Sequence, residues 1–384
     1  MSFFEPFNLE RFFAEHEFST PYLLCSSDCE SMPARELLAM EPGSDERLLD
    51  LRLGYTESRG DPSLRADIAR LYAGLGPDQV IVHAGAEEAI LNLCLAILSP
   101  GDRVVVPFPC YQSLAEIPRA LGCEVLPWEL RPEGGRWAAD PDELARLLER
   151  PARLVVLNMP HNPTGALMRA GELARAVELC RRSGALLLVD EVYRHLELDP
   201  ARRLPAACEA YEGGISLNVL SKSAGLAGLR IGWLATRRKD VLDAVATVKD
   251  YNSICASGPS ELLAGVAVRN LERLAARSLG LVRRNLELAR GLFARRPGFA
   301  SWIEPEGGSI AFPRLAGETA RRFGGDAEAL AAALAREAGV LLLPGGRYGH
   351  DRDRFRLGLG RANFPEGLAR LEAWLDGAAP AGKR

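Results

Sequence analysis

The sequence has no run of 18 uncharged apolar residues, so nothing in it predicts a membrane-spanning helix. Its start lacks the basic segment and long apolar core of a usual signal peptide. The formal net charge is −4, and no cluster of basic residues is interleaved with aromatic ones. A nucleic-acid-binding function is therefore not indicated. Together these absences favour a cytoplasmic protein without a membrane or nucleic-acid partner.

Two further patterns are missing. The eight cysteines do not form the short-spaced pairs of a zinc site. Cys25 and Cys29 come closest, but no second pair or histidine cluster completes four ligands, so we expect reduced thiols and no metal. No Gly-x-Gly-x-x-Gly opens a helix after a first strand, which argues against a Rossmann nucleotide fold.

The chain has 384 residues, 47% of them hydrophobic, which is enough for two domains or for one large domain with a satellite. Strand-like apolar runs alternate with helical patterns through the first two thirds of the chain. One continuous amphipathic helix is predicted from Ser260 to Arg295, connecting this region to a C-terminal one. In the C-terminal region, strands are expected near Ile310–Phe312, Val340–Leu343 and Phe355–Leu359.

A lysine follows one of the strand-like runs. The apolar run 215–220 precedes Lys222, which stands among small residues before the apolar pattern resumes at Leu229. At a strand end facing a cavity, desolvation lowers the pKa of a lysine, so that its amine can form a Schiff base with an aldehyde. Arg230 follows after two glycines and could clamp an anion with paired hydrogen bonds. The alternative for Lys222, taken alone, is a surface lysine in a loop.

Polar or aromatic residues also follow the other strand-like runs. Tyr111 leaves one strand where it could lie flat on a planar ring, and Asn162 stands in an Asn-Pro-Thr-Gly turn after another. Asp190 ends a fully apolar strand, where a carboxylate is costly unless it meets a cation. Gly85 precedes a predicted helix whose first amides could bind phosphate.

The segment Ser-Lys-x-x-Gly-x-x-Gly-x-Arg-x-Gly around Lys222 resembles the lysine segment of class I/II aminotransferases, which are fold-type I enzymes that use pyridoxal 5'-phosphate. By that resemblance Lys222 carries the cofactor. Arg230 and the backbone amides of Ala86 and Glu87, after Gly85, bind the cofactor's phosphate. The family often has a phosphate-binding Ser or Thr three residues before the lysine, whereas this chain has Val219, so no such contact is expected.

The same resemblance assigns the remaining parts of the site. Tyr111 stacks on the cofactor ring, and Asp190 pairs with the protonated ring nitrogen. Asn162 and Tyr193, the latter in the Asp-Glu-x-Tyr motif, donate hydrogen bonds to the phenolic oxygen. Arg356, in a strand we expected at the edge of a sheet, grips the substrate α-carboxylate.

The N-terminal third is expected to border the substrate and a second subunit. Ser27 lies in a Ser-Ser loop that the resemblance places at the substrate entrance, and Tyr55 would reach the cofactor phosphate of the other subunit. The implied assembly is a homodimer with two shared sites. The implied fold is α/β, with a large domain of mostly parallel, helix-flanked sheet and a smaller α/β domain built from both termini. We expect an N-terminal segment 1–45, a cofactor domain 46–270 and a small domain 271–384.

Transfer of an amino group between an L-amino acid and a 2-oxo acid is the activity that the resemblance implies first, with Lys222, Asp190 and Tyr193 as catalytic residues. The same residues serve elimination and cyclisation, and the Ser-Ser loop is also similar to that of capreomycidine-synthase-like enzymes, which cyclise a hydroxylated arginine. A non-catalytic sensor that binds the cofactor is a third reading. Such regulators carry a DNA-binding domain first, and only about 50 residues precede Tyr55 here.

Overall fold

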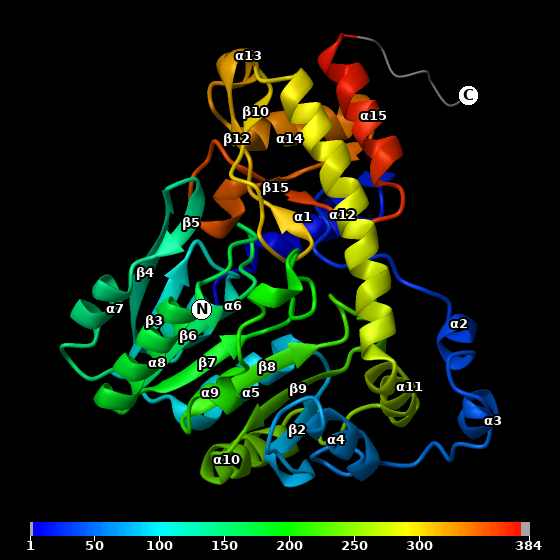
Figure 1. Cartoon of the computed structure of the whole chain (residues 1–384), viewed down its shortest axis with the longest axis vertical. Helices are drawn as coiled ribbons and strands as arrows, with labels where there is room; N and C mark the ends of the chain where they lie inside the picture. The colour runs from blue at the N-terminus through cyan, green and yellow to red at the C-terminus, as the bar shows by residue number, and fades with distance from the viewer. Residues whose placement is uncertain (1–2, 378–384) are drawn as a thin grey trace.

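The computed structural model describes residues 3–377. A large sheet forms the lower part of the molecule in Figure 1, and a smaller α/β part lies above it. The large sheet has the strand order β2-β9-β8-β7-β6-β3-β4-β5, and only β9 and β5 run antiparallel to their neighbours. In chain order its strands are β2 (Val80–His83), β3 (Arg103–Phe108), β4 (Glu124–Glu133), β5 (Arg136–Ala139), β6 (Leu154–Asn158), β7 (Leu186–Asp190), β8 (Gly214–Val219) and β9 (Gly232–Thr236).

Helices cover both faces of this sheet, which is why its central strands are apolar throughout. In β6, Leu154 and Val156 face one hydrophobic cluster, while Val155 and Leu157 face another. Strands buried on both faces lose the apolar-polar alternation of half-exposed ones. The helices of this part are α4 (Pro62–Ala69), α5 (Ala86–Ile97), α6 (Ser113–Ala120), α7 (Pro141–Leu147), α8 (Ala170–Ser183), α9 (Ala207–Ala210), α10 (Lys239–Asp250) and α11 (Gly258–Arg269).

Both ends of the chain build the smaller part. Strand β1 pairs in parallel with β13, and β15 lies between β11 and β14 in a three-stranded sheet. The N-terminal elements are α1 (Asn8–His16), β1 (Tyr22–Leu23), α2 (Ala34–Leu38) and α3 (Ser44–Leu49). The C-terminal elements are α12 (Leu271–Arg295), β10 (Ala300–Ser301), β11 (Ile310–Ala311), β12 (Arg314–Leu315), α13 (Gly317–Arg322), α14 (Ala327–Ala338), β13 (Val340–Leu341), β14 (Leu343–Pro344), β15 (Phe355–Gly358) and α15 (Phe364–Leu375).

The prediction of one helix from Ser260 to Arg295 is wrong, because α11 ends before α12 begins. Asn270 separates the two helices with φ −112° and ψ 19°, outside helical geometry. Its side-chain Nδ2 donates to the carbonyl of Val266 at 2.9 Å, and the Asn270 backbone amide donates to the same carbonyl at 3.2 Å. After this break, α12 runs along one side of the molecule toward the small part (Figure 1).

The parallel strands bring their carboxyl ends to one edge of the large sheet. Asn158 at the end of β6 is paired in register with Asp190 at the end of β7, and Asp190 with Leu217 on β8. Ligands of open α/β sheets bind at this edge. Within residues 3–377, no helix has the length and apolar character needed to cross a membrane.

Candidate active site

A cavity of about 540 Å³ lies between the carboxyl ends of the strands and the N-terminal segment. All of the predicted site residues line it except Gly85 and Tyr55. The sequence patterns thus identified residues that are far apart in the chain but close in the fold. The roles assigned to them stay predictions, and the following contacts show what each side chain can do.

Asp190 and Lys222 are the two charged groups at the floor of the cavity. Asp190 is 5% exposed, and its Oδ1 accepts a hydrogen bond from the Val192 amide at 3.2 Å. Burial raises the pKa of Asp190 to about 7, so this carboxyl needs a nearby cation to stay ionised. Burial also lowers the pKa of Lys222 from its ordinary value. Its Nζ donates to Ser27 Oγ at 2.9 Å and lies 5.9 Å from the Tyr193 ring centroid.

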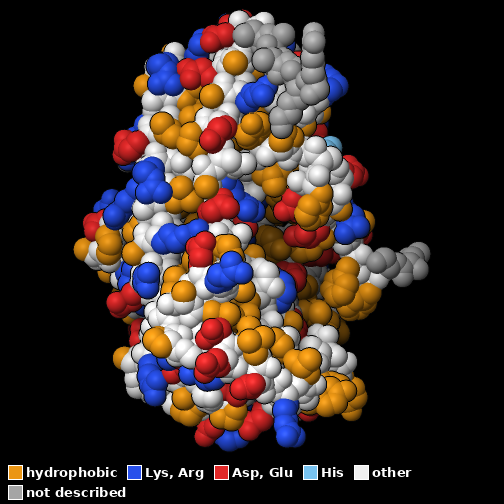
Figure 2. Space-filling model, turned by 90° about the vertical axis from the view of Figure 1, so that its right-hand side faces the viewer, with side chains coloured by type: hydrophobic (Ala, Val, Ile, Leu, Met, Phe, Trp, Pro, Cys, Tyr) orange, Lys and Arg blue, Asp and Glu red, His pale blue; other side chains and the backbone are white. Residues whose placement is uncertain are grey.

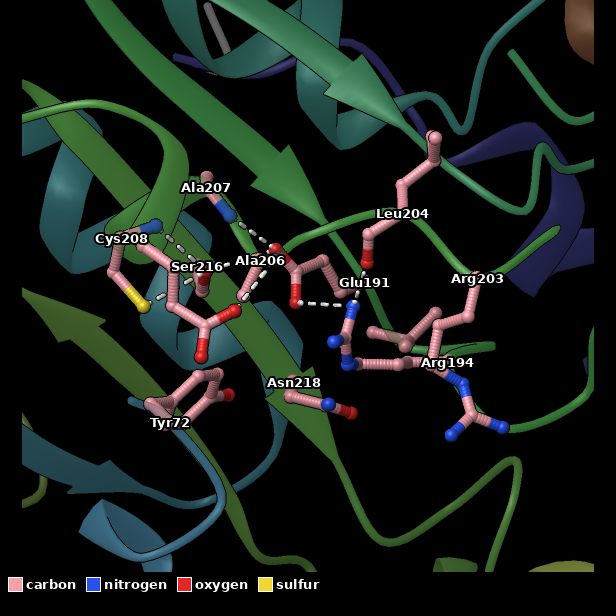
Figure 3. A network of polar contacts seen from close by, with 12 residues as sticks. Tyr72, Glu191, Arg194, Arg203, Leu204, Ala206, Ala207, Cys208, Ser216 and Asn218 are labelled. Carbon is pink, nitrogen blue, oxygen red and sulfur yellow. Dashed lines mark hydrogen bonds and ion pairs between the residues drawn. The ribbon is translucent and has the colours of Figure 1, made fainter. Parts of the chain in front are cut away.

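A second buried carboxylate holds the chain next to Asp190, and the sequence analysis gave it no role. Glu191 is 3% exposed, and its Oε1 accepts hydrogen bonds from the Ala207 amide and from Ser216 Oγ, both at 2.8 Å. Figure 3 shows this network, in which Ser216 on β8 also contacts Cys208. Glu191 therefore ties the end of β7 to β8 and α9, and this fixes the direction of Asp190. A second acidic residue directly after an apolar strand was a signal in the sequence that Glu191 would be buried and hydrogen-bonded.

Arg356 lies at the other side of the cavity and is 2% exposed. The expectation of an edge strand is wrong, because β15 has a partner on each side. The sequence analysis expected a strand near Ile310–Phe312, but it did not show that this strand pairs with the one that carries Arg356. Arg356 Nε donates to the Cys25 carbonyl at 2.9 Å, and Nη1 donates to the Tyr348 hydroxyl at 2.7 Å. Its Nη2 has no hydrogen-bond partner within residues 3–377, so it is available for an anion in the cavity.

Asn162 is held from two directions. Its backbone amide donates to Asn158 Oδ1 at 2.7 Å, and its side-chain Oδ1 accepts from the Tyr348 hydroxyl at 3.0 Å. Asn158 Nδ2 in turn donates to the Asp190 carbonyl at 3.1 Å. Asn158 and Tyr348 are therefore positioning residues that the sequence analysis missed. A polar residue at the end of an apolar strand was the signal for Asn158, whereas nothing local marked Tyr348.

The N-terminal turn of α5 and Arg230 form a second polar end of the cavity. Gly85 has φ +94°, and a Cβ added there would stand 2.3 Å from Arg230 Nη2, so only glycine allows this close approach. The Ala86 and Glu87 amides lie in the first turn, where they have no intrahelical acceptor. Arg230 donates to the Ala227 carbonyl at 3.2 Å and has no carboxylate partner within the described residues.

The remaining wall comes from the N-terminal segment. Phe7, Glu10 and Glu17, in or beside α1, line the cavity, and the Phe7 ring lies 5.2 Å from that of Tyr111. Glu10 and Glu17 form no ion pair within residues 3–377. The sequence analysis predicted only that this segment would pack near the substrate. The helix and its acidic face were not recognised, because an isolated nine-residue helix has a weak signal.

Comparisons with known proteins agree with this geometry. The family described as Aminotransferase class I and II matches residues 23–370. Capreomycidine synthase of Streptomyces vinaceus is 33% identical over 369 residues, covering 94% of this chain and 92% of that protein. The chain belongs to the class I and II aminotransferase family.

Two solved structures give the same result for the fold. A PLP-dependent aminotransferase from Streptococcus suis has a TM-score of 0.90 at 30% identity and covers 99% of this chain and 100% of its own. The PLP-dependent cyclase OrfR has a TM-score of 0.88 at 31% identity, with 98% of each chain covered. The predicted α/β fold with a mostly parallel large sheet is confirmed, and so is pyridoxal 5'-phosphate as the cofactor of this family member.

The residues of this aminotransferase-family chain fit the cofactor's three polar ends. Gly85 leaves room beside Arg230 and the α5 turn for a phosphate, whose charge suits both the guanidinium and the helix N-terminus. The buried Asp190 forms no ion pair with any residue of the described part of the chain, and a protonated ring nitrogen would supply a cation. Lys222 lines the same cavity, and its amine could attach the cofactor's aldehyde there.

Tyr55 is the one predicted contact that this chain cannot make with its own cavity. It is 90% exposed and does not line the cavity. A role in a neighbouring subunit would require such a position, but the contact itself stays a prediction.

The buried position of Asp190 predicts a pH-dependent stability. In the cofactor-free protein, Asp190→Asn should raise the free energy of unfolding at pH 8 by about 1–2 kcal/mol. The folded-state pKa of about 7 lies above the ordinary aspartate value of 3.8, so the parent loses stability as pH rises from about 4 through 7. The variant lacks this loss, and its advantage should shrink at pH 5. Urea unfolding at both pH values measures the difference.

The control is Asp142→Asn, which changes an exposed aspartate at the start of α7 and should have no such effect. An equal gain for Asp190→Asn at both pH values, or a loss at pH 8, would contradict the buried-carboxyl argument. Added cofactor should stabilise the parent more than the variant, because only the parent offers a charge to the ring nitrogen.

Proposed function

We propose that this chain is an aminotransferase that moves an amino group between an L-amino acid and a 2-oxo acid. The observation that supports it most is the presence of Lys222, Asp190 and Arg356 in one buried cavity. When bound, pyridoxal 5'-phosphate forms a Schiff base with amines and stabilises negative charge at the substrate Cα. The chain's own residues must then orient the amino acid and move one proton.

Each of these tasks has a candidate side chain. Arg356 Nη2 is free to bind the substrate carboxylate while its Nε and Nη1 are held by the protein. Lys222 Nζ, with its pKa lowered by burial, would take the proton from the substrate Cα and deliver it to the carbon of the cofactor's aldehyde group, as amino-group transfer requires. Asp190 holds the ring nitrogen protonated, and Asn162 and Tyr193 donate to the phenolic oxygen.

The cavity wall favours an amino acid with a cationic side chain. Glu10 and Glu17 stand in the wall without ion-pair partners among residues 3–377, and Asp28 lines the same cavity while paired with Arg361 at 2.9 Å. Burial raises the pKa of Glu17, and Asp28 and Glu10 raise it further while Arg361 opposes them, so a substrate cation would relieve the repulsion among the carboxylates.

Elimination or cyclisation of a cationic amino acid is the second candidate. The same acidic wall supports it, as does the similarity to capreomycidine synthase and to the cyclase OrfR. Both reactions begin with loss of the Cα proton to Lys222 and differ in what leaves afterwards. A cofactor-binding sensor is the third candidate, and it would bind amino acids without releasing a product.

A screen of the purified protein against amino acids tests this proposal. We expect arginine to change the absorbance of the bound cofactor at concentrations at least tenfold below those needed for citrulline, its neutral counterpart. A 2-oxo acid should then restore the original spectrum. Released ammonia or a cyclic product would instead identify the second candidate, and an absorbance change without any product would identify the sensor.

Variants of α1 test the acidic wall. Glu17→Gln should weaken arginine binding several-fold and leave citrulline binding unchanged, because only arginine carries the charge. Glu15→Gln is the matched control, since Glu15 lies on the same helix, is 73% exposed in its side chain and does not line the cavity. Equal effects of Glu17→Gln on both amino acids would contradict a cationic substrate.

We propose in addition that the enzyme is a homodimer. Leu49, Leu53, Tyr55, Tyr251 and Ile254 are large hydrophobic side chains exposed by half or more. Thr56 Oγ1 donates to the Ala256 carbonyl at 3.2 Å, so the two segments that carry them lie side by side. Figure 2 shows a side of the molecule on which hydrophobic side chains are interspersed with charged ones and gather toward the lower right. A contact with a second copy would cover this surface.

Mixing two inactive variants tests the shared site. Lys222→Ala and Tyr55→Ala should each lose most activity alone. Random exchange of subunits makes half of the dimers mixed, each with one intact site, so about a quarter of parent activity should return. Activity assays before and after mixing measure it. If the mixture stays at the level of the single variants, Tyr55 does not serve the neighbouring site.

A further inference from the structure

A buried polar cluster lies beside the N-terminal turn of α5, outside the lining of the cavity. Lys249, one of the four lysines in the sequence, lies in the last turn of α10 and is 0% exposed. Glu88, in the first turn of α5, has a side chain that is 8% exposed. Burying an ammonium group and a carboxylate is costly unless their hydrogen bonds are satisfied.

The cluster forms a continuous path from Lys249 to the turn before α5. Lys249 Nζ donates to Ser253 Oγ and to the Ile254 carbonyl, both at 3.2 Å. Ser253 Oγ donates to Glu88 Oε1, and Glu88 Oε2 accepts a hydrogen bond from the Ala84 amide. Ala84 directly precedes Gly85, so the path ends at the turn that presents the first amides of α5.

Two asparagines extend the cluster beside Glu88, while the carboxylates of Glu261 and Asp250 act on Lys249 more weakly than Glu88 does. Asn92 Nδ2 donates to Glu88 Oε1 at 3.4 Å, and Asn252 Nδ2 donates to Asn92 Oδ1 at 3.1 Å. His83 Nδ1 lies 3.8 Å from Glu88 Oε2, but burial lowers the pKa of His83 to about 3, so the imidazole is neutral. Lys249 is therefore the group that balances the negative charge of Glu88.

We propose that Lys249, Ser253 and Glu88 form a positioning unit for the cofactor phosphate. This inference rests on the proposed phosphate site at Ala86, Glu87 and Arg230. Glu88 holds the Ala84 amide and so sets the direction of the amides that follow it. Its carboxylate also stands in the same helical turn as the phosphate-binding amides, where it would repel a dianion. The positive charge of Lys249 offsets this repulsion, and Ser253 holds Lys249 near Glu88 by hydrogen bonds to both side chains.

Comparing two forms of the cofactor isolates this role. Pyridoxal lacks the phosphate but has the same ring and aldehyde, so its binding to Lys222 does not use the α5 turn. In the parent apoprotein, pyridoxal 5'-phosphate should bind much more tightly than pyridoxal. The preference ratio is the dissociation constant of pyridoxal divided by that of pyridoxal 5'-phosphate. Lys249→Met should lower this ratio about tenfold by weakening the binding of pyridoxal 5'-phosphate, and it should leave pyridoxal binding unchanged. Absorbance titrations measure both constants.

Lys239→Met is the matched control, because Lys239 begins the same helix, its side chain is 81% exposed and it pairs with Asp243. Its ratio should equal that of the parent. Ser253→Ala keeps both charges and breaks the path, so it should lower the ratio about threefold, and it decides the question if Lys249→Met does not fold.

Three results would overturn the proposal. An unchanged ratio in Lys249→Met removes the positioning role. If Lys249→Met does not fold, an unchanged ratio in Ser253→Ala removes it instead. Equal weakening of both ligands shows general damage to the site. A parent protein with no preference for the phosphorylated form would refute the phosphate site as well, which separates failure of the proposed site from failure of this inference alone.

Discussion

The structure depends on keeping a carboxylate and an amine buried in one cavity at the carboxyl edge of the large sheet. Asp190 and Lys222 both lose hydration there, which raises the pKa of the acid and lowers that of the amine. Both pKa shifts reflect a cost to the stability of the protein without its cofactor. Both suit a site that receives a ring nitrogen at one residue and an aldehyde at the other. The fold stores a cost that its cofactor can offset.

Much of the surrounding structure holds these two groups in place. Glu191 ties the end of β7 to β8, and Asn158 connects β6 to the Asp190 carbonyl. The N-terminal segment closes the cavity by bringing Ser27 Oγ to Lys222 Nζ at 2.9 Å. A Cβ at Gly358 would stand 2.0 Å from the Ser26 carbonyl, so glycine in β15 is what lets this segment pack so closely. The cavity thus combines residues at the ends of the large-sheet strands with residues from both ends of the chain.

The sequence allowed the cofactor site to be predicted wherever one residue follows a recognisable strand. Asp190 and Lys222 were predicted in this way, and family resemblance added their roles. Prediction from the sequence failed where the place of a residue depends on contacts with segments far away in the chain. Arg356 was expected at a sheet edge because the sequence does not show that β11 pairs with β15. The break at Asn270 is a change of backbone geometry at one residue, which hydrophobic periodicity does not show. The acidic wall of α1 and the path from Lys249 to Ala84 likewise join residues that no local pattern connects.

The central claim is that the cofactor is joined to Lys222 and to no other lysine. The sequence makes this simple to test, since only four lysines are present. Borohydride reduction of the protein with its bound cofactor, followed by proteolysis and mass mapping, locates the adduct. The account predicts one modified peptide, which contains Lys222, and an unmodified Lys249. An adduct on another lysine, or no adduct in protein that holds the cofactor, would contradict it.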